Sequence, residues 1–275
     1  MSAVADVLGE QVQAWDVEFA AVGVTRAAAE VAAHGDRRRA VRLASVSKPV
    51  TALALLVAAE EGVIDLDEPL GPPGSTVRHL LAHTSGLPFE GDTPIAAPGR
   101  RRIYSNEGFS VLGEHLAARA EMPFADYVRA AVVEPLGIGL DPHGHPGAGM
   151  HACLDDVLAF ARELLAPTLI APETHAELTA VQFPGLAGVL PDWGRYDPLD
   201  WGLGVEVKGA KAPHWSGSLT SPATFGHFGG SGTFVWVDPV RAIGCACLTD
   251  RPFGDWAKTA WPRLSEAVLT ELDGA

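Results

Sequence analysis

Apolar positions follow a strand-like pattern at both ends of the chain. Short apolar runs separated by turn residues over 17–44, and again over 200–250, predict β-strands. The clearest is a hairpin in which Gly232–Val237 and Ala242–Leu248 flank a turn at Asp238-Pro239. Because strands occur at both ends, we expect one sheet assembled from both ends of the chain.

Between these regions the apolar residues recur at helical spacing. The first long helix is predicted over 46–62: Pro49 suits a first turn, Gly62 ends it, and apolar residues repeat one turn apart at Leu53, Leu56 and Val57. Further helices are predicted near 76–83, 107–119, 124–133, 154–165, 172–180 and 254–272. The Gly- and Pro-rich stretches Asp141–Gly149 and Pro184–Pro198 are predicted to be loops.

This order of elements predicts an α/β protein of the α+β type. An antiparallel sheet built from both chain termini is flanked by helices, and a helical lobe is inserted between its strands. We expect a single domain over 1–275, in which 1–70 and 198–275 form the α/β lobe and 71–197 the helical lobe. No internal repeat is present.

Composition excludes several classes of protein. With 47% hydrophobic and 20% charged residues, the chain is an ordinary globular one. Its formal net charge of −14 repels phosphate backbones, which argues against a nucleic-acid partner. Arg100-Arg101-Arg102, one of two tight basic clusters, is interpreted as a solvated loop.

The cysteines and the N-terminal residues bear on location. Cys245 and Cys247 are two apart in a strand-like run and should face one side of it. With Cys153 they are interpreted as buried free thiols, which suits a reducing compartment. The first residues lack the pattern of a signal peptide, and no apolar run is long enough to span a membrane. We therefore expect a cytoplasmic protein with no membrane partner.

The strongest chemical signal is the S-x-x-K formed by Ser45 and Lys48 at the start of the first long helix. Residues three apart on a helix share a face. A serine hydroxyl becomes a nucleophile when a neighbouring base takes its proton, and a lysine can be that base if burial lowers its pKa. The helix N-terminus also favours the negative charge that develops on the substrate oxygen.

The rarity of lysine strengthens this interpretation. Only four residues are lysine, namely Lys48, Lys208, Lys211 and Lys258, and the remaining basic residues are arginine. A lysine in such a chain suggests a position where arginine would not serve. The alternative is a helix-capping Ser45 beside a solvated Lys48.

Two further motifs follow in the chain. Tyr104 and Asn106 form its only Y-x-N, where Tyr104 is a candidate proton shuttle and Asn106 would hold either Lys48 or a substrate amide. His227, Gly229 and Gly230 form an H-x-G-G on or beside a strand, and the N–H of Gly230 would join that of Ser45 in an oxyanion hole. A core tyrosine, a capping Ser/Asn pair and an incidental turn histidine are the alternatives.

The order S-x-x-K, Y-x-N, H-x-G resembles the class C β-lactamase-related family, which includes penicillin-binding proteins, D-amino-acid peptidases and esterases. The family's LLxHTSGL, EPLG and third-motif segments are matched by Leu80–Leu87, Glu134–Gly137 and Gly226–Asp238. The similarity covers roughly 40–250.

The resemblance implies a role for each motif residue. Ser45 would be the nucleophile, Lys48 its partner and Tyr104 the general acid/base, while Asn106 would contact the lysine or the substrate. Ser45 and Gly230 would supply the oxyanion N–H groups. His227 stands where the family has a third-motif lysine, and a neutral histidine would lack the fixed positive charge that holds a substrate carboxylate.

Two groups of histidines were weighed as metal sites. His79 and His83 lie four apart on a predicted helix, and both are interpreted as structural because no third ligand is in view. His143, His145 and His151 lie in a Gly/Pro loop, which is interpreted as a surface loop. We expect no metal and no other cofactor.

Three functions compete. We favour a serine hydrolase that cleaves small ester or amide substrates, including β-lactams, through a Ser45 acyl-enzyme and prefers esters. The second is a D-amino-acid peptidase, carboxypeptidase or β-lactamase with the same machinery, and the third is a non-catalytic binding protein on this fold. In each case the partner is a small molecule, and the oligomeric state is left open.

Overall fold

The computed structural model, which describes residues 3–274, is built on a six-stranded antiparallel sheet. The strand order is β2-β1-β11-β10-β9-β8, so strands from the two ends of the chain meet where β1 pairs with β11. The strands are β1 (Ala20–Thr25), β2 (Glu30–His34), β8 (Glu206–Val207), β9 (Phe225–Gly229), β10 (Thr233–Asp238) and β11 (Ile243–Thr249). The predicted fold class and the β10–β11 hairpin are both confirmed.

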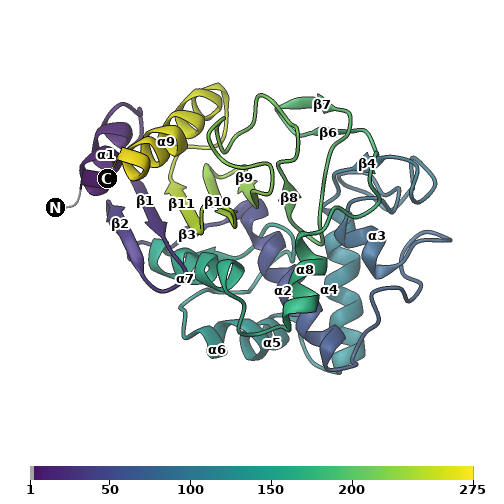
Figure 1. Cartoon of the computed structure of the whole chain (residues 1–275). Helices are drawn as coiled ribbons and strands as arrows, with labels where there is room; N and C mark the ends of the chain where they lie inside the picture. The colour runs from purple at the N-terminus through teal and green to yellow at the C-terminus, as the bar shows by residue number, and fades with distance from the viewer. Residues whose placement is uncertain (1–2, 275) are drawn as a thin grey trace.

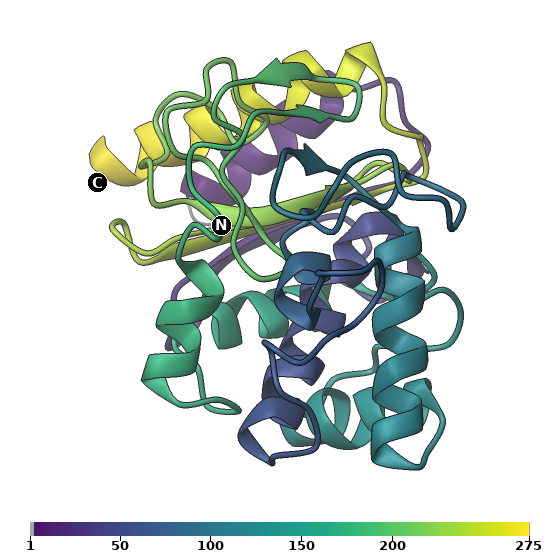
Figure 2. The same ribbon diagram turned by 90° about the vertical axis from the view of Figure 1, so that its right-hand side faces the viewer.

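Helices cover both faces of this sheet, as Figures 1 and 2 show. On one face α1 (Ala3–Gln13) and α9 (Asp255–Gly274) pack together; on the other lie α2 (Ser47–Glu60) and α7 (Leu154–Leu165). Alternate strand residues supply the two cores: Phe234 and Trp236 of β10 face α9, whereas Val235 and Val237 join the core that contains α2 and α7.

The cysteines follow the same alternation. Cys245 and Cys247 are buried free thiols on the α9 side of β11, as their spacing predicts. Cys153 differs, because it precedes α7 as its N-cap residue and remains partly exposed. The prediction of a buried thiol is therefore wrong for Cys153.

The remaining helices surround α2. They are α3 (Val77–Leu81), α4 (Glu107–Ala120), α5 (Phe124–Val128), α6 (Glu134–Leu136) and α8 (Pro172–Thr179). The helix predicted over 124–133 is present, and within it residues 129–133 form a π-helical turn between α5 and α6. Within residues 3–274, no helix is both long and apolar enough to cross a membrane.

Three short pieces of structure depart from the prediction. The N-terminal α1 was not predicted, although Val4 and Leu8 are buried one turn apart. The stretch predicted as a loop over 184–198 contains β6 (Gly188–Leu190) and β7 (Gly194–Tyr196), which form a small sheet with β4 (Arg102–Ile103). The run at 40–44 contains β3 (Val41–Arg42), which pairs with β5 (His151–Ala152) and not with the central sheet. Such short strands depend on partners far away in sequence.

Candidate active site

Ser45 lies in a tight turn at the junction of sheet and helix. It is the middle residue of a 3₁₀ turn, Ala44–Val46, that leads directly into α2. Ala44 has a φ of 46°, a left-handed conformation that is strained for a residue with a Cβ. The turn is held against β10 by the Thr233 hydroxyl, which donates to the carbonyl oxygen of Leu43 (2.7 Å). Ser45 thus lies partly exposed beside β9 and β10, where the turn leads into α2.

Lys48 is completely buried one turn further along α2. Its Nζ lies 2.6 Å from Asn106 Oδ1, 2.9 Å from the carbonyl oxygen of Gly147 and 3.2 Å from Ser45 Oγ. Burial lowers the pKa of Lys48 well below its ordinary value, because no carboxylate is among these partners to offset the loss of hydration. The alternative of a solvated Lys48 is wrong.

The three partners of Lys48 Nζ differ in the hydrogen bonds that they can make. The oxygens of Asn106 and Gly147 can only accept hydrogen bonds, so they take two N–H groups of the amine. In the neutral amine, the lone pair is left for the third direction, toward Ser45 Oγ. The arrangement can therefore receive the serine proton.

Tyr104 follows β4 and its ring covers the lysine. Lys48 Nζ lies 4.7 Å from the ring centroid, and the hydroxyl is 3.4 Å from His227 Nε2. Loss of hydration raises the pKa of Tyr104, while a hydrogen bond with Ser45 acts in the opposite direction. The phenol thus connects the serine with the histidine.

His227 is buried in β9 as a neutral imidazole. Its Nδ1 lies 2.6 Å from the carbonyl oxygen of Phe228, which can only accept, so Nδ1 carries the proton. Nε2 is then the acceptor that faces the Tyr104 hydroxyl. Burial is the largest cause that lowers the pKa of His227 to about 3, and the charge of Lys48, when that amine is protonated, acts in the same direction. No fixed positive charge therefore stands at the position of the third-motif lysine.

Asn106 directs its side chain at the lysine and not at the end of its own helix. It is the N-cap residue of α4 but makes no side-chain capping bond; instead Ser105 Oγ accepts from the Gly108 N–H (2.9 Å). Of the two roles considered for Asn106, contact with Lys48 is the one present in this geometry. The capping alternative applies to Ser105.

Sequence reasoning missed several neighbours of these residues. Gly147, in the loop predicted over 141–149, supplies the carbonyl oxygen for Lys48, and a Cβ at this position would lie 3.2 Å from Nζ. Trp201 is buried with its ring 5.9 Å from that of Tyr104 and 5.5 Å from that of His227. The ring of the motif residue His83 packs against that of Tyr104 in a tilted arrangement, with centroids 4.6 Å apart. A loop glycine and a core tryptophan carry no sequence signal for such a role.

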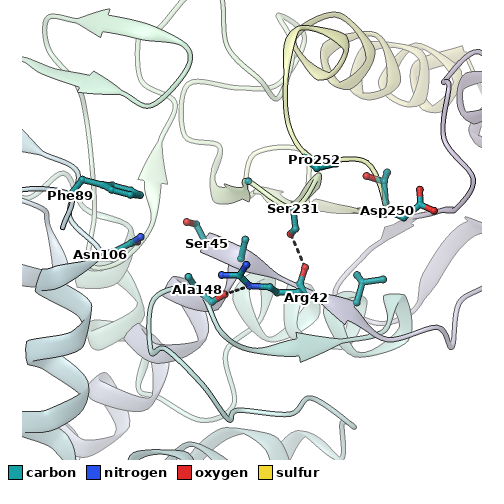
Figure 3. A pocket seen from close by; sticks show the side chains of 12 residues that line it. Arg42, Ser45, Phe89, Asn106, Ala148, Ser231, Asp250 and Pro252 are labelled. Atoms are coloured by element: carbon teal, nitrogen blue, oxygen red, sulfur yellow. Dashed lines mark hydrogen bonds between the residues drawn. The ribbon is translucent and has the colours of Figure 1, made fainter.

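The site opens into a cleft of about 520 Å³ (Figure 3). Ser45, Asn106 and Gly230 line it directly, and Phe89 and Asn106 stand on the side opposite Ser231 and Pro252. Gly229 is buried behind this wall, where an added Cβ would come within 2.3 Å of the carbonyl oxygen of Leu43. The three sequence motifs therefore meet at one cleft, although they lie far apart along the chain.

The comparisons with known proteins agree with this arrangement. A family model described as Beta-lactamase matches residues 4–140 and 138–269. The chain belongs to the β-lactamase family. A solved structure, a β-lactamase from Mycobacterium bovis, is 50% identical with a TM-score of 0.94, and the match covers 96% of this chain and 98% of that one. The family resemblance drawn from the motifs is confirmed.

Curated relatives of this family match over shorter stretches. Penicillin-binding protein 4* of Bacillus subtilis (strain 168) is 30% identical over 129 residues, 35% of this chain and 29% of that protein. A putative D-alanyl-D-alanine carboxypeptidase of Salmonella enteritidis PT4 is 25% identical over 207 residues, 58% of this chain and 48% of that protein. The chain thus spans half or less of the length of these relatives.

Three of the histidines weighed as metal ligands have other side-chain partners in this β-lactamase-family chain. His79 Nδ1 pairs with Thr76 Oγ1 (2.9 Å), His143 with Asp141 (2.6 Å) and His145 Nε2 with Ser110 Oγ (2.9 Å). Among the described residues, no group of three His, Cys, Asp or Glu side chains is placed to hold a metal ion.

Proposed function

We propose that this protein is a serine hydrolase that cleaves small ester or amide substrates through an acyl-enzyme on Ser45, with a preference for esters. The observation that carries the proposal is the set of contacts around Lys48. Two pure acceptors hold the amine, and Ser45 Oγ occupies the third direction at 3.2 Å. Such a geometry supports proton transfer from the serine to a buried neutral lysine.

In the first step Lys48 takes the proton of Ser45 as Oγ attacks the substrate carbonyl. The N–H groups of Ser45 and Gly230, both at the cleft, would hold the oxygen as it becomes negative, aided by the N-terminus of α2. Tyr104 then delivers a proton to the departing alcohol or amine and recovers one from Lys48. The acyl group remains bonded to Ser45.

In the second step water releases the acyl group. We assign activation of this water to Tyr104, whose hydroxyl faces the unprotonated Nε2 of His227 at 3.4 Å. The Tyr104 oxygen accepts a proton from the water as its own proton passes to Nε2 of His227, and the hydroxide adds to the acyl carbonyl. When the bond between the acyl carbon and Ser45 Oγ breaks, Tyr104 gives a proton to Ser45 and recovers one from His227. Lys48 is the alternative base for this step.

The preference for esters rests on His227. Its pKa of about 3 makes it neutral near pH 7, so it would not offer the ionic contact that a carboxylate-bearing β-lactam or D-peptide uses best. The second candidate function, β-lactamase or D-amino-acid carboxypeptidase activity, is favoured by the names of the Mycobacterium and Salmonella relatives. The two differ in substrate and share the proposed machinery.

The test is intact-mass spectrometry after treatment with a fluorophosphonate, on wild type and on Ser45→Ala. We expect one adduct on wild type and none on the variant. No adduct on folded wild type would contradict the proposal and favour a non-catalytic binding protein. The values of kcat/KM for an aryl ester, a cephalosporin and a D-Ala-D-Ala peptide then rank the substrates, and a higher value for either of the last two would reverse the preference.

A further inference from the structure

A second cavity of about 720 Å³ adjoins the Ser45 cleft. It is formed by the strand β4, the β6–β7 hairpin and the loop that carries Phe89. Phe89 lines both cavities, and its ring stacks on that of Tyr104 with centroids 5.9 Å apart and planes 22° apart. Tyr104 itself lines the second cavity, which therefore lies on the tyrosine side of the reacting centre.

The walls of this cavity are apolar. Phe89, Ile95 and Val189 are 47%, 55% and 58% exposed, and they are three of the six exposed large hydrophobic side chains among the described residues. Exposed apolar side chains that gather at a hollow indicate a binding surface rather than chance exposure.

The mouth of the cavity is cationic. Arg100, Arg101 and Arg195 line it, and none of the described lining residues is acidic. Among the described residues, Arg101 donates to the carbonyl oxygen of Ile95 (3.1 Å) and to no carboxylate, and Arg195 is 3.5 Å from an exposed Asp197. Arg100 has no carboxylate partner within residues 3–274. In a chain of net charge −14, such a group of largely unneutralised arginines is a local exception.

Arg102 shows that this arginine cluster is not simply a solvated basic loop. It is buried, and its guanidinium donates to the carbonyl oxygens of Leu199 (2.6 Å) and Gln182 (2.7 Å) and to that of Ala82. The interpretation of the arginine cluster as a solvated loop is therefore wrong for Arg102, which fastens the cavity wall. Arg100 and Arg101 are thereby held at its mouth.

We infer that this cavity binds the leaving-group side of the substrate and selects an amphipathic group whose carboxylate or other anion reaches the arginines past Phe89, outside the Ser45 cleft and away from His227. The inference rests on the proposed hydrolase function, in which Tyr104 donates a proton to the leaving atom. That atom must then lie on the side of Tyr104, and the group attached to it extends into the cavity past Phe89. The volume suits a small molecule, and the arginines complement its charge.

The test compares three butyrate esters whose leaving groups are 3-hydroxybenzoate, its neutral methyl ester and cationic 3-(aminomethyl)phenol. We expect the anionic ester to have the highest kcat/KM after correction for uncatalysed hydrolysis. Each of Arg100→Gln, Arg101→Gln and Arg195→Gln should lower the anionic-to-neutral ratio roughly two- to fivefold, and the triple variant more. High salt should lower the same ratio.

The matched control is Arg263→Gln, which removes the same charge from an exposed position on α9. The ratio should be unchanged in this variant. A ratio that falls equally in Arg263→Gln, or that stays constant in the triple variant, would overturn the inference.

A binding measurement makes the inference independent of turnover. Titration calorimetry with 4-phenylbutyrate and with 4-phenylbutanol should show tighter binding of the anion to wild type, and loss of that difference in the triple arginine variant. If fluorophosphonate labels Ser45 but the anionic-to-neutral ratio of kcat/KM is the same in wild type and the triple variant, only the proposed subsite is refuted. If 4-phenylbutyrate binding depends on the arginines but fluorophosphonate does not label Ser45, only the proposed hydrolase function is refuted.

Discussion

At the scale of single residues, burial gives Lys48 the lowered pKa that its proposed role as a base requires. Lys48 shares its Nζ between two acceptors and the serine, and loss of hydration lowers its pKa. Lysine usage alone does not identify this role, because Lys208 and Lys211 are also buried. Lys208 instead donates to the carbonyl oxygens of Gly217 (2.9 Å) and Thr220 (2.6 Å) and so fastens a loop.

Lys48→Arg should abolish most activity. A guanidinium stays protonated and has no lone pair for the Ser45 proton, so we expect kcat to fall roughly 10²- to 10⁴-fold. Ester hydrolysis measures the effect, and circular dichroism confirms that the variant is folded. Activity within about tenfold of wild type would show that the lysine acts only as a fixed charge.

The pH profile of wild type should have two limbs. Activity rises as Lys48 loses its proton, and because burial lowers its pKa this limb should lie well below 10.5. Activity falls again when Tyr104 loses its proton, above pH 10.0, because burial raises its pKa. The measurement is kcat/KM for a neutral ester against pH, and an acid limb at the ordinary lysine pKa would contradict the assignment.

At the scale of elements, β9 and the 3₁₀ turn at 44–46 approach so closely that only glycine fits between them. A Cβ on Gly229 would lie 2.3 Å from the carbonyl oxygen of Leu43 and 3.2 Å from Ala44 Cβ. The close approach sets Ser45 beside Gly230. The geometry of the proposed oxyanion site therefore depends on how a strand and a turn from opposite ends of the chain pack.

Gly229→Ala should push β9 away from the turn. We expect a loss of about 1–3 kcal/mol in the free energy of unfolding and a kcat reduced by more than tenfold, since oxyanion geometry is sensitive to small shifts. Urea unfolding and ester hydrolysis provide the two readouts. Gly254→Ala is the control, because its nearest neighbour would be 3.8 Å away.

The edge strand β8 carries a buried charge network that stabilises the sheet next to His227. Glu206 contacts Trp215 Nε1 (2.7 Å), His214 Nε2 (3.2 Å) and Lys211 Nζ (3.4 Å). Burial acts to raise the pKa of Glu206, but Lys211 and His214 outweigh it and lower the pKa to about 2.

Glu206→Gln should destabilise the fold by about 3 kcal/mol at neutral pH, because Lys211 would be left buried without its counter-ion. The ionised carboxylate stabilises the folded state fully above its ordinary pKa of 4.5, and this contribution is lost as pH falls toward 2. Urea unfolding should therefore show a wild-type advantage that shrinks as pH falls below 4.5. An advantage that does not change with pH would exclude an ionic role for Glu206.

At the scale of the whole molecule, the sheet joins two cores into one structure. Leu56 of α2 is buried on one face and Leu264 of α9 on the other, and alternate residues of β1, β10 and β11 contribute to both cores. Neither face can lose its helices without exposing the strands that support the other face.

Unfolding should consequently be a single transition. Leu56→Ala and Leu264→Ala should each cost about 2–5 kcal/mol and shift one common transition to lower temperature. Differential scanning calorimetry measures the number of transitions, and equal calorimetric and van't Hoff enthalpies indicate a single one. Two separated transitions in either variant would show that the lobes unfold independently.

The sequence by itself determined most of the longer elements and which residue types carry the candidate chemistry. The α7 bounds, the β10–β11 hairpin and the three motifs follow from periodicity and spacing, which are local properties. The segment 188–196 was predicted to be a loop because it is rich in Gly and Pro, but β6 pairs with its neighbour β7 and with the distant β4.

Only the tertiary structure decided what each group does at the site. It buries Lys48, supplies the Gly147 oxygen from a loop 99 residues away, and lines the second cavity with Arg100 and Arg195. Burial, and with it the shift of a pKa, depends on neighbours that periodicity does not reveal. Spacing along a chain places two groups on one face of a helix, but the dielectric around them comes from residues distant in sequence.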